Sequence, residues 1–93
     1  MFARVSTYRG DGDRLLAGFA DVSEPLEAID GFSHAYFMVD RENGKGMSIT
    51  IWDSEEALLA SAAQADELRS RGAEAGGATI ESVEHYEIGM TVP

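Results

Sequence analysis

The side chains that could take part in acid–base or metal chemistry are few in this sequence. It has two histidines, His34 and His85, a single tryptophan, Trp52, and no cysteine. The lack of cysteine excludes disulfides, thiolate metal sites and cysteine nucleophiles. A mononuclear metal site usually takes three or four ligands, so we expect no metal here. The segment 10–13 (GDGD) begins like a calcium loop, but Val22 stands where the closing glutamate is needed, which leaves a turn and a helix cap.

The size and charge of the chain limit the classes of partner. Its 93 residues suit a single domain, which we predict over residues 1–93, and 44% hydrophobic with 26% charged residues is typical of a globular protein. The 17 acidic residues outnumber the 7 basic ones, and a net charge of −10 repels nucleic acids. No apolar run reaches the roughly 18 residues of a membrane helix, and the N-terminus lacks the layout of a signal peptide. We therefore expect a cytoplasmic protein with no nucleic-acid or membrane partner.

Hydrophobic periodicity predicts four strands and two helices. Alternating side chains indicate strands over residues 2–9, 32–40, 46–53 and 78–90. The first helix has an apolar face with spacings of four and three residues, formed by Leu15, Phe19, Val22, Leu26 and Ile29. Asp13 is expected to cap this helix, and Pro25 to kink it or to split it after Ser23 or Glu24.

The second helix completes a recognisable order of elements. Asp53 or Ser54 is expected to cap it, and it should end near Arg71, before Gly72. The chain then reads β-α-β-β-α-β. This order predicts an α+β protein with the ferredoxin-like arrangement and one antiparallel sheet.

The turn between the second and third strands decides which side chains share a face. A two-residue turn at Asn43-Gly44 competes with a three-residue loop that pairs Arg41 with Lys45 and places Met38 opposite Ser48. We favour the three-residue loop because it separates apolar from polar side chains and so specifies strand pairing better. One face is then wholly apolar, with Ala35, Phe37, Val39, Met47, Ile49 and Ile51. The other face is mixed, with His34, Tyr36, Met38, Ser48, Thr50 and Trp52.

The apolar hairpin face predicts self-association. Two helices can cover only one face of a four-stranded sheet, and a large exposed apolar patch is unusual in a monomer. Burial of its large side chains contributes on the order of 10 kcal/mol per chain. We therefore expect a homodimer in which the apolar faces of two sheets meet.

Three segments of the chain together resemble one known family. They are a strand that opens with GF after a kinked helix, a turn with the sequence DRENGKG, and a strand that continues into WDSEEAL. With these segments, and with the closing VEHYEIG, essentially the whole chain resembles the antibiotic biosynthesis monooxygenase (ABM) family of the dimeric α/β-barrel superfamily. The resemblance implies a ferredoxin-like protomer, a dimer that closes a barrel between two sheets, and a pocket between each sheet and its own helices.

On this resemblance the mixed hairpin face lines the pocket. The second helix presents small residues to the sheet, which leave either tight packing or a cavity for a flat apolar or aromatic ligand. Helix residues expected at the pocket are Phe19, Leu58, Ser61, Leu68 and Arg71. Arg71, together with Arg69, would hold an anionic group at the mouth or would only complement the helix dipole.

The resemblance also implies a chemistry without a cofactor. Family members that oxidise aromatic polyketides use neither metal nor flavin, and deprotonate a phenol in a dry site with an aromatic wall. Beside Trp52, this chain has Ser48, Met38 and Leu58 where those enzymes have asparagine, histidine and tyrosine. His34, opposite Trp52 in the expected register, is our candidate for the catalytic base, and packing of its ring on the indole is the structural alternative.

Two functions therefore stay open. The first is a dimeric barrel that binds a small apolar or aromatic ligand, or that only supports a partner, without chemistry. The second is a cofactor-independent monooxygenase that oxidises an aromatic or polyketide-like substrate with dioxygen. The haem-degrading branch of the family uses an asparagine on the first strand and a histidine on the second helix. Here the only asparagine, Asn43, lies in the turn and the second helix has no histidine to ligate iron, so haem degradation is strongly disfavoured.

Overall fold

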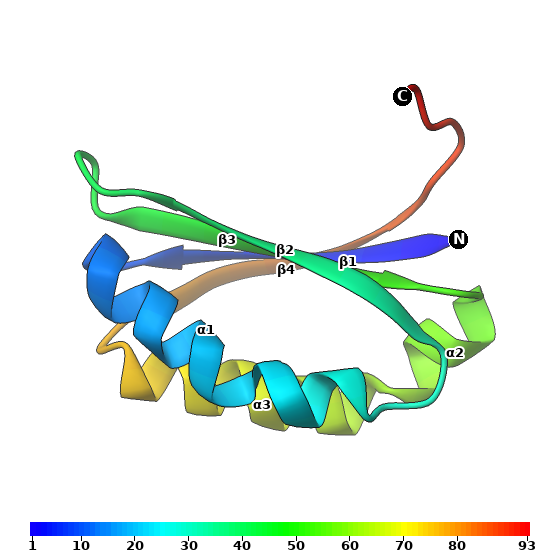
Figure 1. Ribbon diagram of the computed structural model, residues 1–93, viewed down its shortest axis with the longest axis horizontal. Coiled ribbons are helices and arrows are strands. Elements are labelled where there is room, and N and C mark those ends of the chain that lie inside the picture. Colours follow the sequence, from blue (N-terminus) through cyan, green and yellow to red (C-terminus); the bar gives the residue numbers. More distant parts are fainter.

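A four-stranded antiparallel sheet with helices on one face makes up the computed structural model, which describes residues 1–93 (Figure 1). The elements are β1 (Phe2–Arg9), α1 (Gly12–Glu27), β2 (Phe32–Asp40), β3 (Lys45–Trp52), α2 (Glu55–Ala60), α3 (Ala62–Ala75) and β4 (Thr79–Glu87). The strand order is β2-β3-β1-β4. The predicted ferredoxin-like α+β fold is thus confirmed. No helix is long and apolar enough to cross a membrane.

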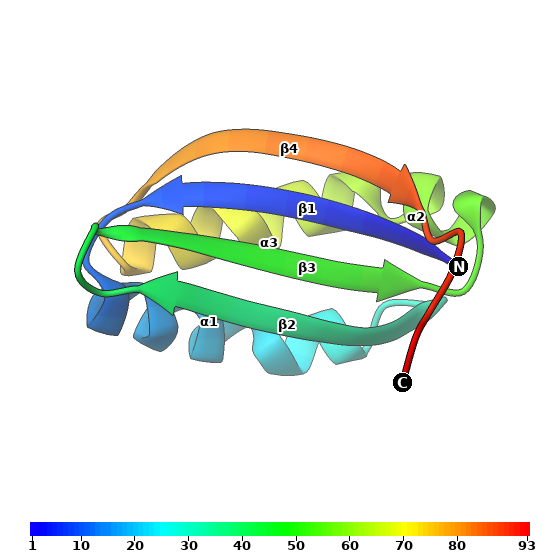
Figure 2. The ribbon, with the colours of Figure 1, turned by 90° about the horizontal axis from the view of Figure 1, so that it is seen from above.

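The other face of the sheet has no helices over it. Figure 2 shows this open face from above, with both helical segments behind the strands and only the C-terminal tail crossing one end. Because all the helices lie on the same side, every strand divides its side chains between a helix-covered face and this open face.

The helix boundaries differ from the predicted ones at three points. Asp11, not Asp13, caps α1, and its carboxylate accepts a hydrogen bond of 3.0 Å from the backbone N–H of Arg14. Pro25 does not split α1, which continues through it for two more residues to Glu27. The second helix is divided at Ser61 and extends beyond Arg71 to Ala75.

The predicted hairpin register is wrong. Asp40 pairs with Lys45, so the loop contains four residues, 41–44. The carboxylate of Asp40 accepts hydrogen bonds from the backbone and side-chain nitrogens of Asn43, at 3.2 and 2.8 Å, and these bonds hold the pKa of Asp40 below its usual range. Gly44 adopts a left-handed conformation with φ +61°, which closes the loop. An aspartate whose side chain accepts a hydrogen bond from a residue two or three positions ahead stabilises a turn. Here this turn gives a loop of four residues in place of the predicted three.

The new register exchanges the two faces of β2. Met38 pairs with Met47 and Phe37 with Ser48, so the side chains of β2 lie on the faces opposite to those predicted. Phe37 and Ala35 pack against the helix-side core, together with Val39. His34, Tyr36 and Met38 share the open face with Met47, Ile49 and Ile51. The predicted placement was therefore right for β3 and wrong for β2.

The helices approach each other closely at two glycines. A Cβ atom on Gly18 of α1 would lie 2.2 Å from the carbonyl oxygen of Gly72 in α3, and one on Gly72 would lie 3.3 Å from the carbonyl oxygen of Gly18. No larger residue fits at Gly18 without a shift of the helices. At this crossing the small residues of α3 produce tight packing.

The core consists of two hydrophobic clusters. One contains Tyr8, Leu15, Phe19 and Ala73. The other contains Leu26, Trp52 and Leu58. Phe37 packs against both clusters.

Candidate functional site

A cavity of about 40 Å³, partly open to solvent, lies between the sheet and the helices. Its polar lining consists of Arg4, Ser6, Tyr8, Ser48, Thr50 and Arg69. Its apolar lining includes Phe19, Val22, Leu26, Phe37, Ala65 and Leu68. Phe19 and Phe37 form an aromatic wall with their ring centroids 4.9 Å apart. This volume accommodates a group of a few non-hydrogen atoms and is well below the roughly 300 Å³ of a site that encloses a whole drug-sized ligand.

Arg4 is the most unusual residue of the cavity, because it is only 3% exposed and has no carboxylate within ion-pair distance. Its Nη2 donates a hydrogen bond of 2.7 Å to the carbonyl oxygen of Leu58, and its Nη1 lies 3.4 Å from the hydroxyl of Ser61. Burial, followed by the charge of Arg69, lowers the pKa of Arg4. A buried charge with only neutral partners is costly, and such groups are concentrated at functional sites.

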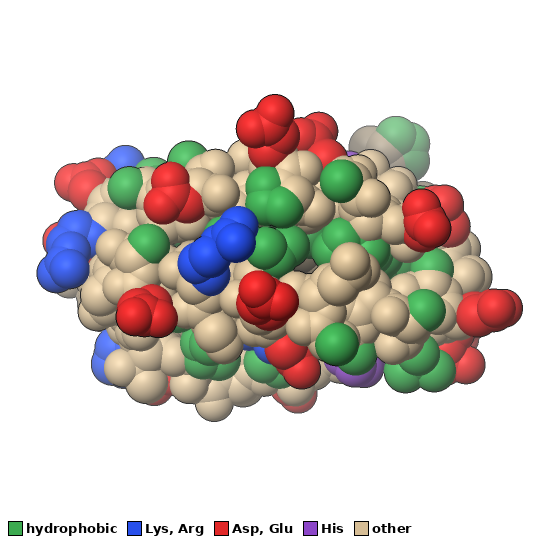
Figure 3. All heavy atoms as spheres, turned by 90° about the horizontal axis from the view of Figure 1, so that it is seen from below, with side chains coloured by type: hydrophobic (Ala, Val, Ile, Leu, Met, Phe, Trp, Pro, Cys, Tyr) green, Lys and Arg blue, Asp and Glu red, His purple; other side chains and the backbone are tan.

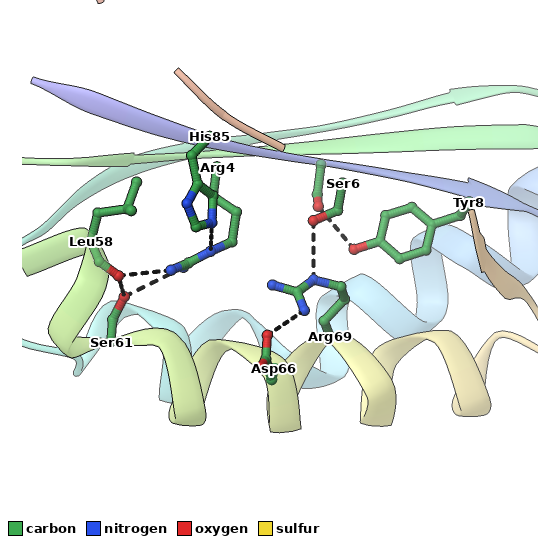
Figure 4. A network of polar contacts seen from close by, with 9 residues as sticks. Arg4, Ser6, Tyr8, Leu58, Ser61, Asp66, Arg69 and His85 are labelled. Atoms are coloured by element: carbon green, nitrogen blue, oxygen red, sulfur yellow. Dashed lines mark hydrogen bonds and ion pairs between the residues drawn. The ribbon is translucent and has the colours of Figure 1, made fainter. Parts of the chain in front are cut away.

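A second guanidinium reaches the cavity from α3. Arg69 donates from Nε to the hydroxyl of Ser6 at 3.0 Å and from Nη1 to the carboxylate of Asp66 at 2.6 Å. The side chain of Arg69 is 9% exposed, whereas that of Asp66 is 67% exposed. Figure 4 shows Arg4 and Arg69 side by side between β1 and α3. In this ion pair the carboxylate of Asp66 therefore lies in solvent, while the guanidinium of Arg69 lines the cavity.

Hydroxyl groups complete the polar lining. The phenol oxygen of Tyr8 and the hydroxyl of Ser48 are 2.9 Å apart, in a buried hydrogen bond between β1 and β3. Tyr8 also packs edge-on against Phe19, with 5.1 Å between the ring centroids. The cavity thus offers guanidinium and hydroxyl donors beside an aromatic surface, a combination that suits an organic ligand with one polar group.

His85 of β4 lies at the edge of this network. Its Nε2 accepts a hydrogen bond of 3.4 Å from Nε of Arg4. Partial burial, followed by the charges of Arg4 and Arg69, lowers the pKa of His85, while Asp66 acts in the opposite direction. Burial and the two arginine charges therefore disfavour the protonated form of the imidazole.

Trp52 lies behind the cavity wall. It is fully buried, and its indole N–H donates to the hydroxyl of Thr50 at 3.0 Å. Phe32 packs edge-on against it at 5.6 Å. Trp52 does not line the cavity itself, but it contacts Arg4 and Thr50, which both do.

The predicted site residues fall into three groups. Phe19, Ser48, Thr50 and Leu68 line the cavity. Trp52, Leu58 and Ser61 are buried next to Arg4. The remaining four lie elsewhere: His34, Tyr36 and Met38 are on the open face or its edge, and Arg71 is exposed on α3.

The structure adds residues that the sequence reasoning did not select, namely Arg4, Ser6, Tyr8 and His85. A signal for three of them was present in β1, where Arg4, Ser6 and Tyr8 alternate with Ala3, Val5 and Thr7. Because strand side chains alternate between faces, these three polar side chains had to share one face. His85 follows from the pairing of β1 with β4, which places it next to Arg4.

The surface around the helices carries more acidic than basic side chains. Figure 3 shows acidic side chains scattered over the helix-bearing face, around a central strip of hydrophobic side chains. No group of three or more histidine and acidic side chains is placed to hold a metal ion.

Comparisons with known proteins agree with this architecture. The ABM family model, described as antibiotic biosynthesis monooxygenase, matches residues 1–69. Two uncharacterised proteins of Mycobacterium tuberculosis, from strains H37Rv and CDC 1551, are 32% identical over 92 residues, which is 95% of this chain. The alignment covers 41% of each of them, so the chain spans about two fifths of the length of these curated relatives.

Solved structures of low sequence identity share the fold. SnoaB, a cofactor-independent oxygenase from Streptomyces nogalater, superposes with a TM-score of 0.74 at 20% identity, covering 99% of this chain and 96% of that one. A monooxygenase from the gene ActVA-Orf6 of Streptomyces coelicolor, in complex with nanaomycin D, gives a TM-score of 0.65 at 19% identity, covering 99% and 91%. Because the family model matches residues 1–69, which are most of this chain, the chain belongs to the antibiotic biosynthesis monooxygenase (ABM) family.

Proposed function

We propose that this protein binds a small aromatic ligand in the cavity between its sheet and its helices. The observation that carries the proposal is the buried guanidinium of Arg4 in a cavity that also has an aromatic and aliphatic wall, formed in part by Phe19 and Phe37. Buried polar groups of this kind fix the orientation of a ligand, while apolar walls supply affinity. Since the cavity volume is about 40 Å³, one polar substituent enters the cavity and the rest of the ligand occupies the opening or displaces α3.

We further propose a homodimer through the open face of the sheet. Tyr36 and Met38 are 57% and 44% exposed on this face, beside Met47 and Ile49. Aromatic and methionine side chains of this exposure are typical of a protein interface. The proposed interface therefore keeps Met47 and Ile49 from the sequence prediction, and Tyr36 and Met38 replace Ala35, Phe37 and Val39. Ile51 is already buried within the protomer.

The second candidate function is cofactor-independent oxygenation of a phenol. Membership of the family and the likeness to an oxygenase fold support it. In this role the guanidinium groups would stabilise a phenolate, and His85, which is hydrogen-bonded to Arg4 at the edge of the network, would accept the phenol proton. This assignment replaces His34 as the candidate base, because His34 lies on the other side of the sheet from the cavity.

Fluorescence and oxygen consumption together test these proposals. Trp52 is the only tryptophan, so 2-naphthol bound in the cavity should change its emission. Ala65 is buried in the cavity wall, and Ala65→Val should weaken binding at least tenfold by filling the space. Ala63→Val, on the exposed side of the same helix, is the matched control and should bind as the parent does.

Oxygen uptake then separates binding from catalysis. If 1,8-dihydroxyanthrone consumes oxygen with the parent and His34→Gln but not with His85→Gln, the oxygenase role is supported. Binding of 2-naphthol without any oxygen uptake supports the binding role alone. Equal binding by the parent and Ala65→Val would overturn the assignment of the cavity.

A further inference from the structure

Two cationic side chains meet in the interior of a strongly acidic protein. The chain carries a net charge of −10, yet Arg4 and Arg69 both line the same cavity. Arg4 has no ion pair, and Arg69 has one, with the largely exposed Asp66. The buried part of the site therefore has more positive than negative charge. Like charges held together in a poorly solvated cavity repel each other strongly, so the arrangement is complementary to an anion.

The guanidinium groups have hydrogen-bond donors to spare for such an anion. Nη2 of Arg69 donates to no protein atom, and Figure 4 shows that it points towards the side chain of Arg4. No buried side-chain nitrogen or oxygen lacks a partner, so this nitrogen is accessible to solvent, on a residue that lines the cavity. The hydroxyl of Ser6, which accepts from Arg69, lies at the same place and can donate its own hydrogen.

The shape and lining of the cavity indicate the class of anion. A planar guanidinium matches a carboxylate, which also fits a space of about 40 Å³. The aromatic pair of Phe19 and Phe37 and the side chain of Leu68 favour an apolar body on the same molecule. A highly charged phosphate compound would meet both these apolar walls and the acidic surface of the helices.

We propose that the space between Arg4 and Arg69 binds the carboxylate group of an aromatic carboxylic acid. This inference rests on the proposed ligand-binding function of the cavity and names the class of ligand. Arg4 supplies the fixed charge from the sheet. Arg69 supplies the nitrogen that closes on the carboxylate from α3.

A pair of probes that differ in charge tests the proposal. Calorimetric titration with 2-naphthoate and with 2-naphthamide compares an aromatic acid with its neutral amide. The parent protein should bind the acid at least tenfold more tightly than the amide. Arg69→Gln should remove this preference while the amide still binds. Arg14→Gln, an exposed arginine of α1, is the control of equal charge and should keep it.

Each alternative result has a distinct meaning. Equal affinity of acid and amide for the parent would overturn the carboxylate site and leave the ligand-binding cavity in place. Binding of neither probe would overturn both. A preference lost in Arg71→Gln but kept in Arg69→Gln would place the anion at the mouth of the cavity and contradict the proposal. Arg4→Gln provides a second removal of charge, and retention of the full preference in both Arg4→Gln and Arg69→Gln would also overturn it.

Discussion

The guanidinium of Arg4 lies over the indole ring of Trp52, with its central carbon 5.5 Å from the ring centroid. A cation over an aromatic face is stabilised by the ring quadrupole, and this contact partly takes the place of a carboxylate partner. The contact also links Trp52, which is part of the family resemblance, to Arg4, which contributes positive charge to the cavity. Trp52 therefore positions Arg4, and changes at Arg4 should be detectable at Trp52.

Replacement of Arg4 by methionine should stabilise the protein while it impairs binding. Methionine fills a similar space without a buried charge, and the carbonyl oxygen of Leu58 keeps the hydroxyl of Ser61 as a donor at 2.8 Å. We expect the free energy of unfolding in urea to rise by on the order of 1 kcal/mol. Arg9→Met removes an exposed ion pair with Glu81 and should change it by less than about 0.5 kcal/mol. A loss of stability in Arg4→Met would show that the contacts of Arg4 fully compensate its burial.

His85 should make the stability depend on pH below neutrality. Its pKa is lowered in the folded protein, so the unfolded chain binds the proton more readily. Stability should therefore fall as the pH decreases through the usual histidine pKa of about 6.5, and the fall should end below the folded pKa. His85→Gln should flatten this part of the curve of unfolding free energy against pH.

The control for this prediction is His34→Gln, which removes a histidine away from both arginines. It should leave the pH dependence as in the parent. Arg4, Arg69 and Asp66 act on His85, and Glu55 and Glu87 lie in the same surface groove. If the unfolding free energy of His85→Gln depends on pH as in the parent, then Asp66, Glu55 and Glu87 cause the pH dependence and not His85.

The contact between the helices should not tolerate a methyl group. Gly18→Ala would place its Cβ 2.2 Å from the carbonyl oxygen of Gly72, which forces α1 and α3 apart. Overpacking of this kind typically costs about 1–3 kcal/mol, measurable by urea unfolding. Gly89→Ala has no atom within 4 Å of the new Cβ and should be close to neutral. Parent-like stability of Gly18→Ala would contradict the packing described for this crossing.

A charge on the open face should separate the proposed dimer. Ile49 lies in the middle of β3, opposite Tyr36, and Ile49→Lys would place a charge in the interface. Sedimentation should show twice the mass of one chain for the parent and the mass of one chain for the variant. Ala63→Lys, on the exposed side of α3, should sediment as the parent does. A parent that sediments as a single chain would contradict the dimer.

The sequence predicts the elements of this fold well because hydrophobic periodicity and helix caps are local signals. The bounds of β1 and β2 agree with the prediction, as does the order of the elements. The hairpin register could not be obtained in the same way. The predicted register makes one face wholly apolar, whereas the helix-covered face in fact carries Ser48 and Thr50 beside Phe37.

That failure has a physical reason. Sorting by hydrophobicity puts all the apolar side chains of the hairpin on one face, whereas Ala35, Phe37 and Val39 in fact face the helices, beside Ser48 and Thr50 of β3. Local patterns fail most often where a protein departs from ordinary packing, and such departures are concentrated at functional sites. The hydrogen bonds between Asp40 and Asn43, which accompany the four-residue loop, are not contained in the hydrophobic pattern.

The central claim is that a ligand binds between the sheet and the helices, and the indole N–H of Trp52 tests it most directly. As the only tryptophan, Trp52 gives a single indole resonance in a nitrogen–proton correlation spectrum, and its N–H bonds to Thr50 at the cavity wall. Titration with 2-naphthol should shift this resonance together with the backbone amides of Ser6, Ser48 and Arg69. Shifts confined to Tyr36, Met38 and Ile49, with the indole resonance unmoved, would place the ligand on the open face and contradict the account.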